Sequence, residues 1–323
     1  MSTVKAGAAV ATMTRMQRFN AAVAGAAVDR PPCLSWSHFS SDALGGTEHA
    51  MRHARYVRDN DWDVCKIVND FRYPIPEGLE TISGPADMLR FERAPMSAPS
   101  FHEELKCIRL LRAEFGPDMP IMLTAFDPFQ QVMRRVGYTK AKLVFAHPRE
   151  ALSMLDAVCS TMVEYMHEVR EAGCDSVFLS VNSAIQPPNS RGIDDTTFKK
   201  FFRPFELRML EAMQGMTRVL HIHGTQLDVS RVIDYPVEVI SVSDRLPGNP
   251  SLAQLREMTS KPLMGGIDES SIVEKSLPEL RAEIHDCVEQ IGREGFILSP
   301  GCTIPTQTPW YLLRAIRETC EAL

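Results

Sequence analysis

Short apolar runs alternate with longer amphipathic stretches along most of this 323-residue chain. Each short run has the length of a buried strand, and the stretches between them place apolar residues at the three- and four-residue steps of helices. Strands that alternate with helices along a chain pair in parallel. The eight predicted strands span residues 33–36, 64–68, 121–124, 176–180, 219–223, 237–241, 262–265 and 295–298. The clearest predicted helices span residues 102–115, 150–172, 196–213 and 271–291.

Eight parallel strands with helices between them predict one α/β domain, a (β/α)8 barrel of the TIM type. In this interpretation the barrel spans residues 31–323, and an N-terminal helical extension spans residues 1–30. An open doubly wound sheet is the alternative. A nucleotide-binding sheet of that kind carries a glycine-rich phosphate turn, and the sequence contains neither G-x-G-x-x-G nor G-x-x-x-x-G-K-[ST].

The composition, 24% charged and 44% hydrophobic residues, is that of a soluble globular enzyme. A formal net charge of −6 argues against a nucleic-acid partner, because surfaces that bind nucleic acids are basic. No apolar stretch approaches the roughly 20 residues that span a bilayer, so no membrane partner is expected. The alanine-rich residues 1–28 favour an amphipathic helix over a signal peptide, because charged residues such as Arg15 and Arg18 interrupt them.

The chain has eight cysteines, and none of them forms a C-x-x-C pair. Scattered cysteines in a chain of this length indicate a reducing compartment rather than a disulfide scaffold, so a cytoplasmic protein is expected. Most of these cysteines should be buried as small hydrophobic residues. Cys302 differs from the others because Gly301 precedes it and a proline-rich turn follows it.

The active site of a parallel barrel lies at the carboxyl ends of its strands, so the polar residues that follow each predicted strand are the site candidates. His38 follows the first strand and is either a catalytic acid or base or a hydrogen-bonded structural histidine. Asp127 either contacts substrate or caps the helix that follows it. The predicted substrate-binding residues are Trp36, Asn69, Asp127 and Asn182.

Two imidazoles and one thiol form the most specific candidate set. His221 and His223 occupy alternate positions of an apolar run, so on a strand their side chains point the same way. With the thiol of Cys302 they supply two nitrogens, one sulfur and an open fourth position, the arrangement of a catalytic zinc. Asp244 is the predicted oxygen ligand, and Glu238 is a less favoured one. The alternative is that His221 is a core histidine and Cys302 an inert thiol.

Asp268 and Glu269 follow two glycines and one isoleucine at the end of a predicted strand. Because the glycines have no side chains, they leave room for a substrate beside the two carboxyl groups. Asp268 and Glu269, together with His38, are therefore the predicted catalytic residues, which orient substrate or move a proton.

Several segments, in this order along the chain, resemble landmarks of the uroporphyrinogen decarboxylase superfamily. They are DRPP at 29–32, FDPF at 126–129, AGCD at 172–175, GGID at 265–268, and PGC at 300–302 with Pro309. The resemblance covers nearly the whole chain, and it implies a (β/α)8 barrel, in agreement with the predicted strands.

The superfamily contains two chemistries. True decarboxylases bind a polycarboxylate tetrapyrrole without a cofactor, through an Arg-Gln-Ala-Gly-Arg element after the first strand. This chain has WSHFSS at residues 36–41 in that place, so the paired arginines that would hold carboxylates are absent. The other branch contains zinc-dependent methyltransferases that use a corrinoid protein and coenzyme M, with cobalamin-independent methionine synthase as a more distant relative.

The methyltransferase branch binds zinc through a His-x-Cys pair and a later cysteine. By resemblance, His221 and Cys302 match the first and last of these ligands, and His223 stands where the middle cysteine is expected. Because imidazole also binds zinc, a histidine in place of the middle cysteine is compatible with a metal site.

The sequence therefore predicts a zinc-dependent methyltransferase or demethylase, which moves a methyl group from a corrinoid or small methylated donor to a thiol or other acceptor. The expected partners are a small-molecule substrate, a separate corrinoid protein and a second copy in a homodimer. The alternative activity is a cofactor-free carboxy-lyase similar to uroporphyrinogen decarboxylase. A non-catalytic binding barrel is a third interpretation, and it predicts that no ligand pocket opens at the strand ends.

Overall fold

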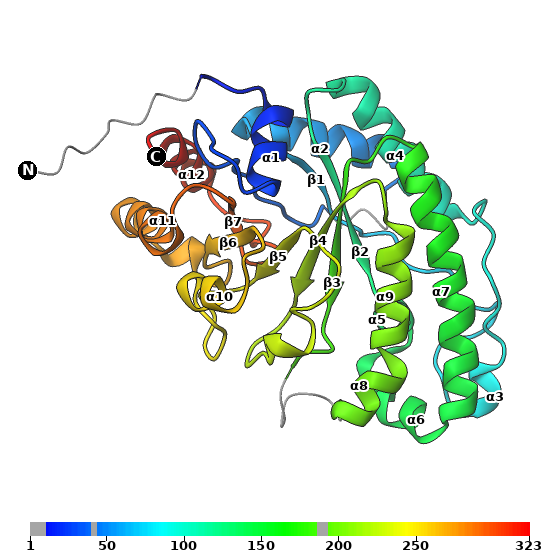
Figure 1. The fold of residues 1–323 in the computed structure, drawn as a ribbon. Coiled ribbons are helices and arrows are strands. Elements are labelled where there is room, and N and C mark those ends of the chain that lie inside the picture. Colours follow the sequence, from blue (N-terminus) through cyan, green and yellow to red (C-terminus); the bar gives the residue numbers. More distant parts are fainter. Residues whose placement is uncertain (1–10, 40–43, 186–192) are drawn as a thin grey trace, which may run out of the picture.

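In the computed structural model, residues 11–39, 44–185 and 193–323 are described. Seven parallel strands pair in sequential order to form one curled sheet, consistent with a TIM-type barrel (Figure 1). Each strand hydrogen-bonds to the next along the chain, so all carboxyl ends lie on one rim. The strands are β1 (Cys65–Ile67), β2 (Ile121–Phe126), β3 (Ser176–Val181), β4 (Thr217–Ile222), β5 (Val239–Val242), β6 (Leu263–Ile267) and β7 (Phe296–Pro300).

Most of the helices cover the outer face of this sheet, while the first of them packs against its inner apolar cluster (Figure 1). The α-helices are α1 (Arg15–Val23), α2 (Gly46–Asn60), α3 (Pro85–Met88), α4 (Pro99–Phe115), α5 (Pro128–Val136), α6 (Ala141–Ala146), α7 (Pro148–Glu171), α8 (Asp195–Phe201), α9 (Arg203–Ala212), α10 (Leu252–Met258), α11 (Leu277–Ile291) and α12 (Trp310–Glu321). The 3-10 helices are η2 (Tyr138–Lys140), η3 (Val229–Arg231) and η4 (Ile272–Glu274).

Seven of the eight predicted strands appear at the predicted places, with ends that differ by a few residues. The predicted helix 196–213 is two helices, because Pro204 has no backbone N–H to continue the first and instead lies in the first turn of α9. The predicted helix 271–291 begins as η4 and restarts after Ser276, whose side chain caps α11.

The first predicted strand, residues 33–36, is reduced to a single bridge between Cys33 and Leu298. Leu34 N–H donates to the Leu298 carbonyl at 3.1 Å, and on the other side Asp63 N–H donates to the Cys33 carbonyl at 2.9 Å. The segment thus connects β7 to the residues before β1. It makes no longer ladder because Pro31 and Pro32 lack N–H groups and the Cys33 N–H donates to the Asp63 carboxylate instead.

The buried Asp63 carboxylate joins parts of the chain that are far apart in sequence. It accepts hydrogen bonds from Arg18 on α1 at 2.9 Å, from Arg30 at 2.6 Å and from Arg317 on α12 at 3.1 Å. Burial alone would raise the pKa of Asp63, but the hydrogen bonds and the charge of Arg30 outweigh burial and lower it. The carboxylate therefore stays ionised and links both ends of the chain to the first β-segment.

The sheet encloses an inner apolar cluster that is separate from the packing between strands and helices. Val219, Val239 and Met264 contribute to this cluster from successive strands, and Phe19 and Ala22 of α1 join it. Helix α1 therefore packs against the interior of the sheet. The predicted extension 1–30 includes residues 1–10, which lie outside the described residues, so the extension as a whole remains a prediction.

No helix in the described part of the chain is long and apolar enough to cross a membrane.

We expect Asp63→Asn to lower the free energy of unfolding by about 3 to 5 kcal/mol, because it leaves the buried Arg30 without its negative partner and removes one of the partners of Arg18 and Arg317. Urea denaturation followed by circular dichroism measures the change. Asp59→Asn is the matched control, because Asp59 forms an exposed pair with Arg55 on α2 and should change stability by about 0.5 kcal/mol or less. Equal effects of the two substitutions would contradict the assigned role of Asp63.

Candidate functional site

A pocket of about 540 Å³ opens at the carboxyl ends of the strands. Its aromatic lining consists of Trp36, Phe126, Tyr138 and Phe178. Its polar lining includes residues from several strand ends, among them His38, Asn182, His221, His223, Glu269 and Cys302. The strand-end face therefore has the concave form expected of a binding or catalytic site, which argues against the non-catalytic interpretation.

His221, His223 and Cys302 meet in this pocket, although 79 residues separate the thiol from the nearer imidazole. His221 Nε2 lies 3.3 Å from His223 Nδ1, and that nitrogen lies 3.7 Å from Cys302 Sγ. One ligand atom from each residue lies within 4.8 Å of the others. The spatial convergence that the metal hypothesis requires is therefore present.

These separations match a tetrahedral zinc site. With zinc–nitrogen distances of about 2.05 Å and a zinc–sulfur distance of about 2.3 Å, tetrahedral angles place two nitrogens about 3.3 Å apart and nitrogen and sulfur about 3.6 Å apart. The observed distances of 3.3 and 3.7 Å agree with both values. The donor set, two imidazoles and a thiol, is also one that zinc prefers.

The buried His221 ring is held in a fixed orientation. Its Nδ1 lies 3.4 Å from Ser241 Oγ on β5, which leaves Nε2 to face His223 and the pocket. The ring also stacks on Phe178 of β3, with 4.6 Å between the ring centres. Burial lowers the pKa of His221, so the imidazole is neutral, as a metal ligand must be.

The Cys302 thiol has an unusual environment among the cysteines. Burial alone would raise its pKa, but its interaction with His221 outweighs burial and lowers it below the ordinary thiol value. Burial instead raises the pKa of other thiols, including Cys65, Cys174 and Cys287. The pKa of Cys320 is also lowered, but of the two only Cys302 lines the pocket, so Cys302 is the one placed to act as a thiolate ligand there.

Gly301 allows the thiol-bearing loop to approach two other strand ends. A side-chain carbon at this position would lie 2.4 Å from Ser243 Cα and 2.8 Å from Glu269 Oε2. Glu269 Oε1 accepts a hydrogen bond from Ser243 Oγ at 2.5 Å, and its buried Oε2 has no hydrogen-bond partner. The structure therefore brings the predicted catalytic Glu269 directly beside the Cys302 loop.

Asp244 and Asp268 lie outside the pocket lining. Asp244 Oδ1 accepts the Gly266 N–H at 2.7 Å, and its Oδ2 lies 3.3 Å from Arg245 Nε. Asp268 accepts hydrogen bonds from the Ser270 and Ser271 side chains, which stabilise the turn before η4. The geometry therefore supports a catalytic role for Glu269 more directly than it supports Asp244 as a ligand or Asp268 as a catalyst. Those two roles stay predictions.

Asp127 is buried and caps α5, because its Oδ1 accepts the Gln130 N–H at 3.0 Å. Its Oδ2 also accepts from the Gln130 side chain, which lines the pocket. Asn69 is buried, does not line the pocket and donates to Glu104. Of the predicted substrate-binding residues, only Trp36 and Asn182 therefore line the pocket.

His38 borders the pocket, and its Nδ1 pairs with Asp70 after β1. Asp70 also accepts the Phe39 N–H at 3.2 Å, so the carboxylate fixes both the ring and the backbone beside it. An imidazole oriented by a carboxylate suits proton transfer and a structural role equally. The last two residues of WSHFSS, Ser40 and Ser41, lie outside the described residues.

Sequence reasoning missed Lys66, which lies within β1 and is fully buried. Its Nζ donates to Thr124 Oγ1 at 2.6 Å and lies 4.2 and 3.9 Å from the ring centres of Trp36 and Phe178. All three partners line the pocket. A single lysine inside an apolar strand was the available signal, because charged residues are rarely buried without a specific partner.

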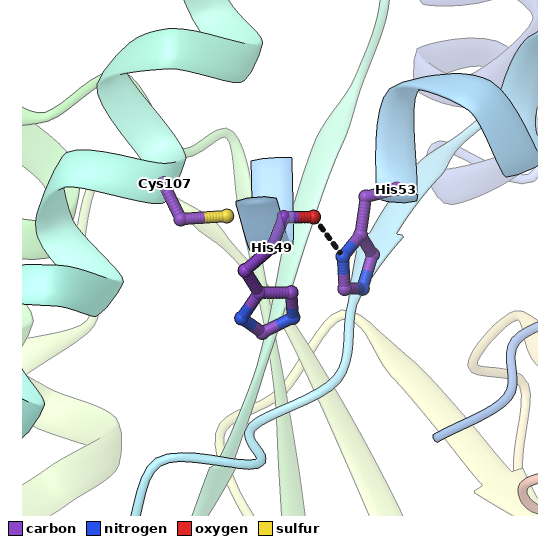
Figure 2. A group of neighbouring side chains, drawn as sticks. All are labelled: His49, His53 and Cys107. Carbon is purple, nitrogen blue, oxygen red and sulfur yellow. Dashed lines mark hydrogen bonds between the residues drawn. The ribbon is translucent and has the colours of Figure 1, made fainter. Parts of the chain in front are cut away.

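A second group of metal-ligand residue types, His49, His53 and Cys107, lies between α2 and α4 (Figure 2). Both nitrogens of His53 are already engaged, because Nδ1 donates to the His49 carbonyl and Nε2 accepts the Val68 N–H. The lone pair that a metal needs is therefore in use. Of the two groups found in the described residues, only the strand-end group is chemically open to a metal.

The uroporphyrinogen decarboxylase (URO-D) family model matches residues 73–323, so this chain belongs to that family. A methyltransferase from Methanosarcina mazei has a similar structure, with a TM-score of 0.74 and 18% identity over 96% of this chain and 99% of that one. A putative vitamin-B12 independent methionine synthase from Listeria monocytogenes gives a TM-score of 0.59 and 15% identity over 86% of each chain. No curated protein matches the sequence.

These comparisons confirm the family resemblance that the sequence motifs indicate. At such low identities, the two solved structures show a shared fold alone, because one fold supports many chemistries. The distinction between methyl transfer and decarboxylation must therefore come from the site.

Lys66 generates a testable pH dependence. Burial lowers the pKa of its ammonium group from the ordinary 10.5 to about 7, and nearby Cys302 opposes the shift. Between these values the unfolded chain binds more protons than the folded one, so the destabilisation by Lys66 is full below about pH 7 and disappears as pH rises. Relative to wild type, Lys66→Met should therefore raise the free energy of unfolding most below pH 7. Above pH 7 this gain should fall by up to about 1.4 kcal/mol per pH unit.

Urea denaturation of wild type and Lys66→Met at several pH values between about 6 and about 10 measures this difference. Lys199→Met, a substitution at an exposed position on α8, is the control, and the difference from wild type should change with pH more for Lys66→Met than for Lys199→Met. A constant difference between Lys66→Met and wild type would contradict the prediction.

Proposed function

We propose that this protein is a zinc-dependent methyltransferase or demethylase that transfers a methyl group from a corrinoid or small methylated donor to a thiol or similar acceptor. The observations that support it most directly are the separations of His223 Nδ1 from His221 Nε2 and from Cys302 Sγ, which both match a tetrahedral zinc site. When bound, zinc would lower the pKa of a thiol substrate and so increase its nucleophilicity. The methyltransferase-like structural neighbours agree with this chemistry.

In this proposal the side chains prepare the acceptor for attack. The acceptor sulfur forms a bond to the methyl carbon, the bond from that carbon to the donor breaks, and the electron pair stays with the donor. Glu269 Oε2, buried and unpaired beside the Cys302 loop, takes the proton that the thiol loses. Burial raises the pKa of Glu269, which makes its carboxylate a stronger base.

The pocket accepts a small molecule rather than a tetrapyrrole donor and acceptor together, since its volume is about 540 Å³. We therefore propose that a corrinoid donor is carried by a separate protein that meets the open strand-end face.

The catalytic unit is residues 31–323 as one (β/α)8 barrel, in which the segment around Cys33 takes the place of the eighth strand. We further propose that the protein forms a homodimer and is located in the cytoplasm.

We expect purified protein to contain about one zinc ion per chain, and His221→Ala or Cys302→Ser to lose it together with methyl transfer. Elemental analysis measures the metal, and the absorbance of methylcobalamin with added 3-mercaptopropionate measures the transfer. His285→Ala, an exposed position on α11, and Cys107→Ser, in the second histidine–cysteine group, should keep the metal.

Activity that persists without metal would end this proposal. Release of carbon dioxide from a carboxylated substrate by metal-free protein would instead favour the cofactor-free carboxy-lyase.

We expect Glu269→Gln to keep its zinc and to lose about 100-fold or more of its turnover, because general-base catalysis contributes that much to proton transfer. Metal content and initial rates are measured on the same preparations. Glu274→Gln, an exposed change on η4, is the matched control and should behave as wild type. Loss of zinc from Glu269→Gln would show that this carboxylate acts as a ligand rather than as a base.

A further inference from the structure

Arg134 of α5 borders the pocket and has an incomplete set of partners. Its Nη2 donates to the Asn69 carbonyl at 3.0 Å, and its guanidinium carbon lies 3.9 Å from the centre of the Phe126 ring. Its Nη1 is buried and makes no hydrogen bond. The Asn69 carbonyl and the Phe126 ring thus hold the guanidinium in place, while its Nη1 has no hydrogen-bond partner.

No carboxylate forms an ion pair with Arg134 in the described part of the chain. Asp70, which lies nearby, pairs with His38. Burial raises the pKa of Glu104 to about 8, and its Oε2 accepts hydrogen bonds from Tyr165 and Asn69. Glu104 is therefore mostly protonated near pH 7, and no carboxylate lies in direct contact with Arg134 to balance its charge.

The net effect of the surroundings is to disfavour the charged form of Arg134. Burial lowers the pKa of Arg134, and repulsion from Arg72 adds to the effect. The acidic groups of Tyr138, Glu104 and Asp70 oppose it only in part. Asn182, on another wall of the same pocket, also has a buried oxygen without a partner. An unpaired buried polar group costs about 1 to 3 kcal/mol, so a ligand that pairs with these groups gains affinity.

Resting on the proposed methyl transfer, we propose that Arg134 binds a carboxylate of the substrate, whose reactive sulfur or oxygen then faces His221, His223 and Cys302. The guanidinium, whose central carbon lies 3.9 Å from the centre of the Phe126 ring, presents a planar fork, and a carboxylate is the planar partner that fits it. The substrate class is a small organic acid that carries a thiol or a methylated heteroatom. This arginine on α5 is distinct from the paired arginines that the strand-end element WSHFSS lacks.

The test compares the binding of 3-mercaptopropionate and its neutral analogue 3-mercapto-1-propanol by isothermal titration calorimetry of zinc-loaded protein. Wild type should bind the acid about 10- to 100-fold more tightly than the alcohol, the range expected for hydrogen bonds to charged groups. Arg134→Gln should lose this preference and keep its affinity for the alcohol. Arg134→Lys, which keeps the charge without the fork, should retain part of the preference.

Arg135→Gln is the matched control, because Arg135 is the exposed neighbour on the same helix and does not line the pocket. It should retain the wild-type preference. Equal affinity of wild type for the two thiols, an unchanged preference in Arg134→Gln, or absence of acid binding overturns the proposal.

The same titrations on metal-free protein separate this proposal from the metal proposal. If both proposals hold, removal of zinc weakens the binding of both thiols and leaves the ratio of the affinity for the acid to that for the alcohol unchanged. If the metal proposal alone fails, zinc has no effect on either thiol, while the preference that depends on Arg134 remains. If the Arg134 proposal alone fails, zinc strengthens both thiols and the ratio is close to one.

Discussion

Parallel pairing of neighbouring strands is the constraint on which the rest of this structure depends. It places every strand's carboxyl end on one rim, so residues as distant in sequence as Trp36, His221 and Cys302 line one pocket. The period of two along each strand then separates the interior into layers. Val219 and Val239 belong to the apolar layer, and His221 and Ser241 follow two residues later, at the level of the pocket.

The pocket combines an apolar wall with polar groups that lack full sets of partners. Arg134 Nη1, Asn182 Oδ1 and Glu269 Oε2 are buried around it without hydrogen bonds. At Asp63, outside the pocket, three arginines surround one buried carboxylate. Buried atoms without hydrogen bonds also occur outside the pocket, at Glu104 Oε1 and Asp244 Oδ2, so the pocket is distinguished by gathering three such groups around one cavity that a ligand can enter.

The two histidine–cysteine groups show why proximity alone does not define a metal site. Each group places its donor atoms within 4.8 Å of one another. In the helical group, the backbone occupies both nitrogens of His53. In the strand-end group, the hydroxyl of Ser241 holds one nitrogen of His221 and directs the other toward His223 and Cys302. Available lone pairs, more than distance, decide which group is suited to zinc.

The sequence by itself determined the parallel α/β architecture, the family and the residue types at the strand ends, because apolar periodicity and local motifs are written in consecutive residues. It also predicted that His221 and His223 face the same way, since the strand period requires it. It overestimated the first strand because Pro31, Pro32 and the side chain of Asp63 remove the hydrogen bonds of a longer ladder.

Only the tertiary structure decided which of the polar candidates share the pocket. It placed Glu269 beside the Cys302 loop and engaged Asp268 in its own turn, although the two residues are adjacent in sequence. It also revealed Lys66 and Arg134, whose importance comes from partners on other strands and from burial. Burial and long-range contact depend on how distant segments pack, and no local pattern of residues encodes them.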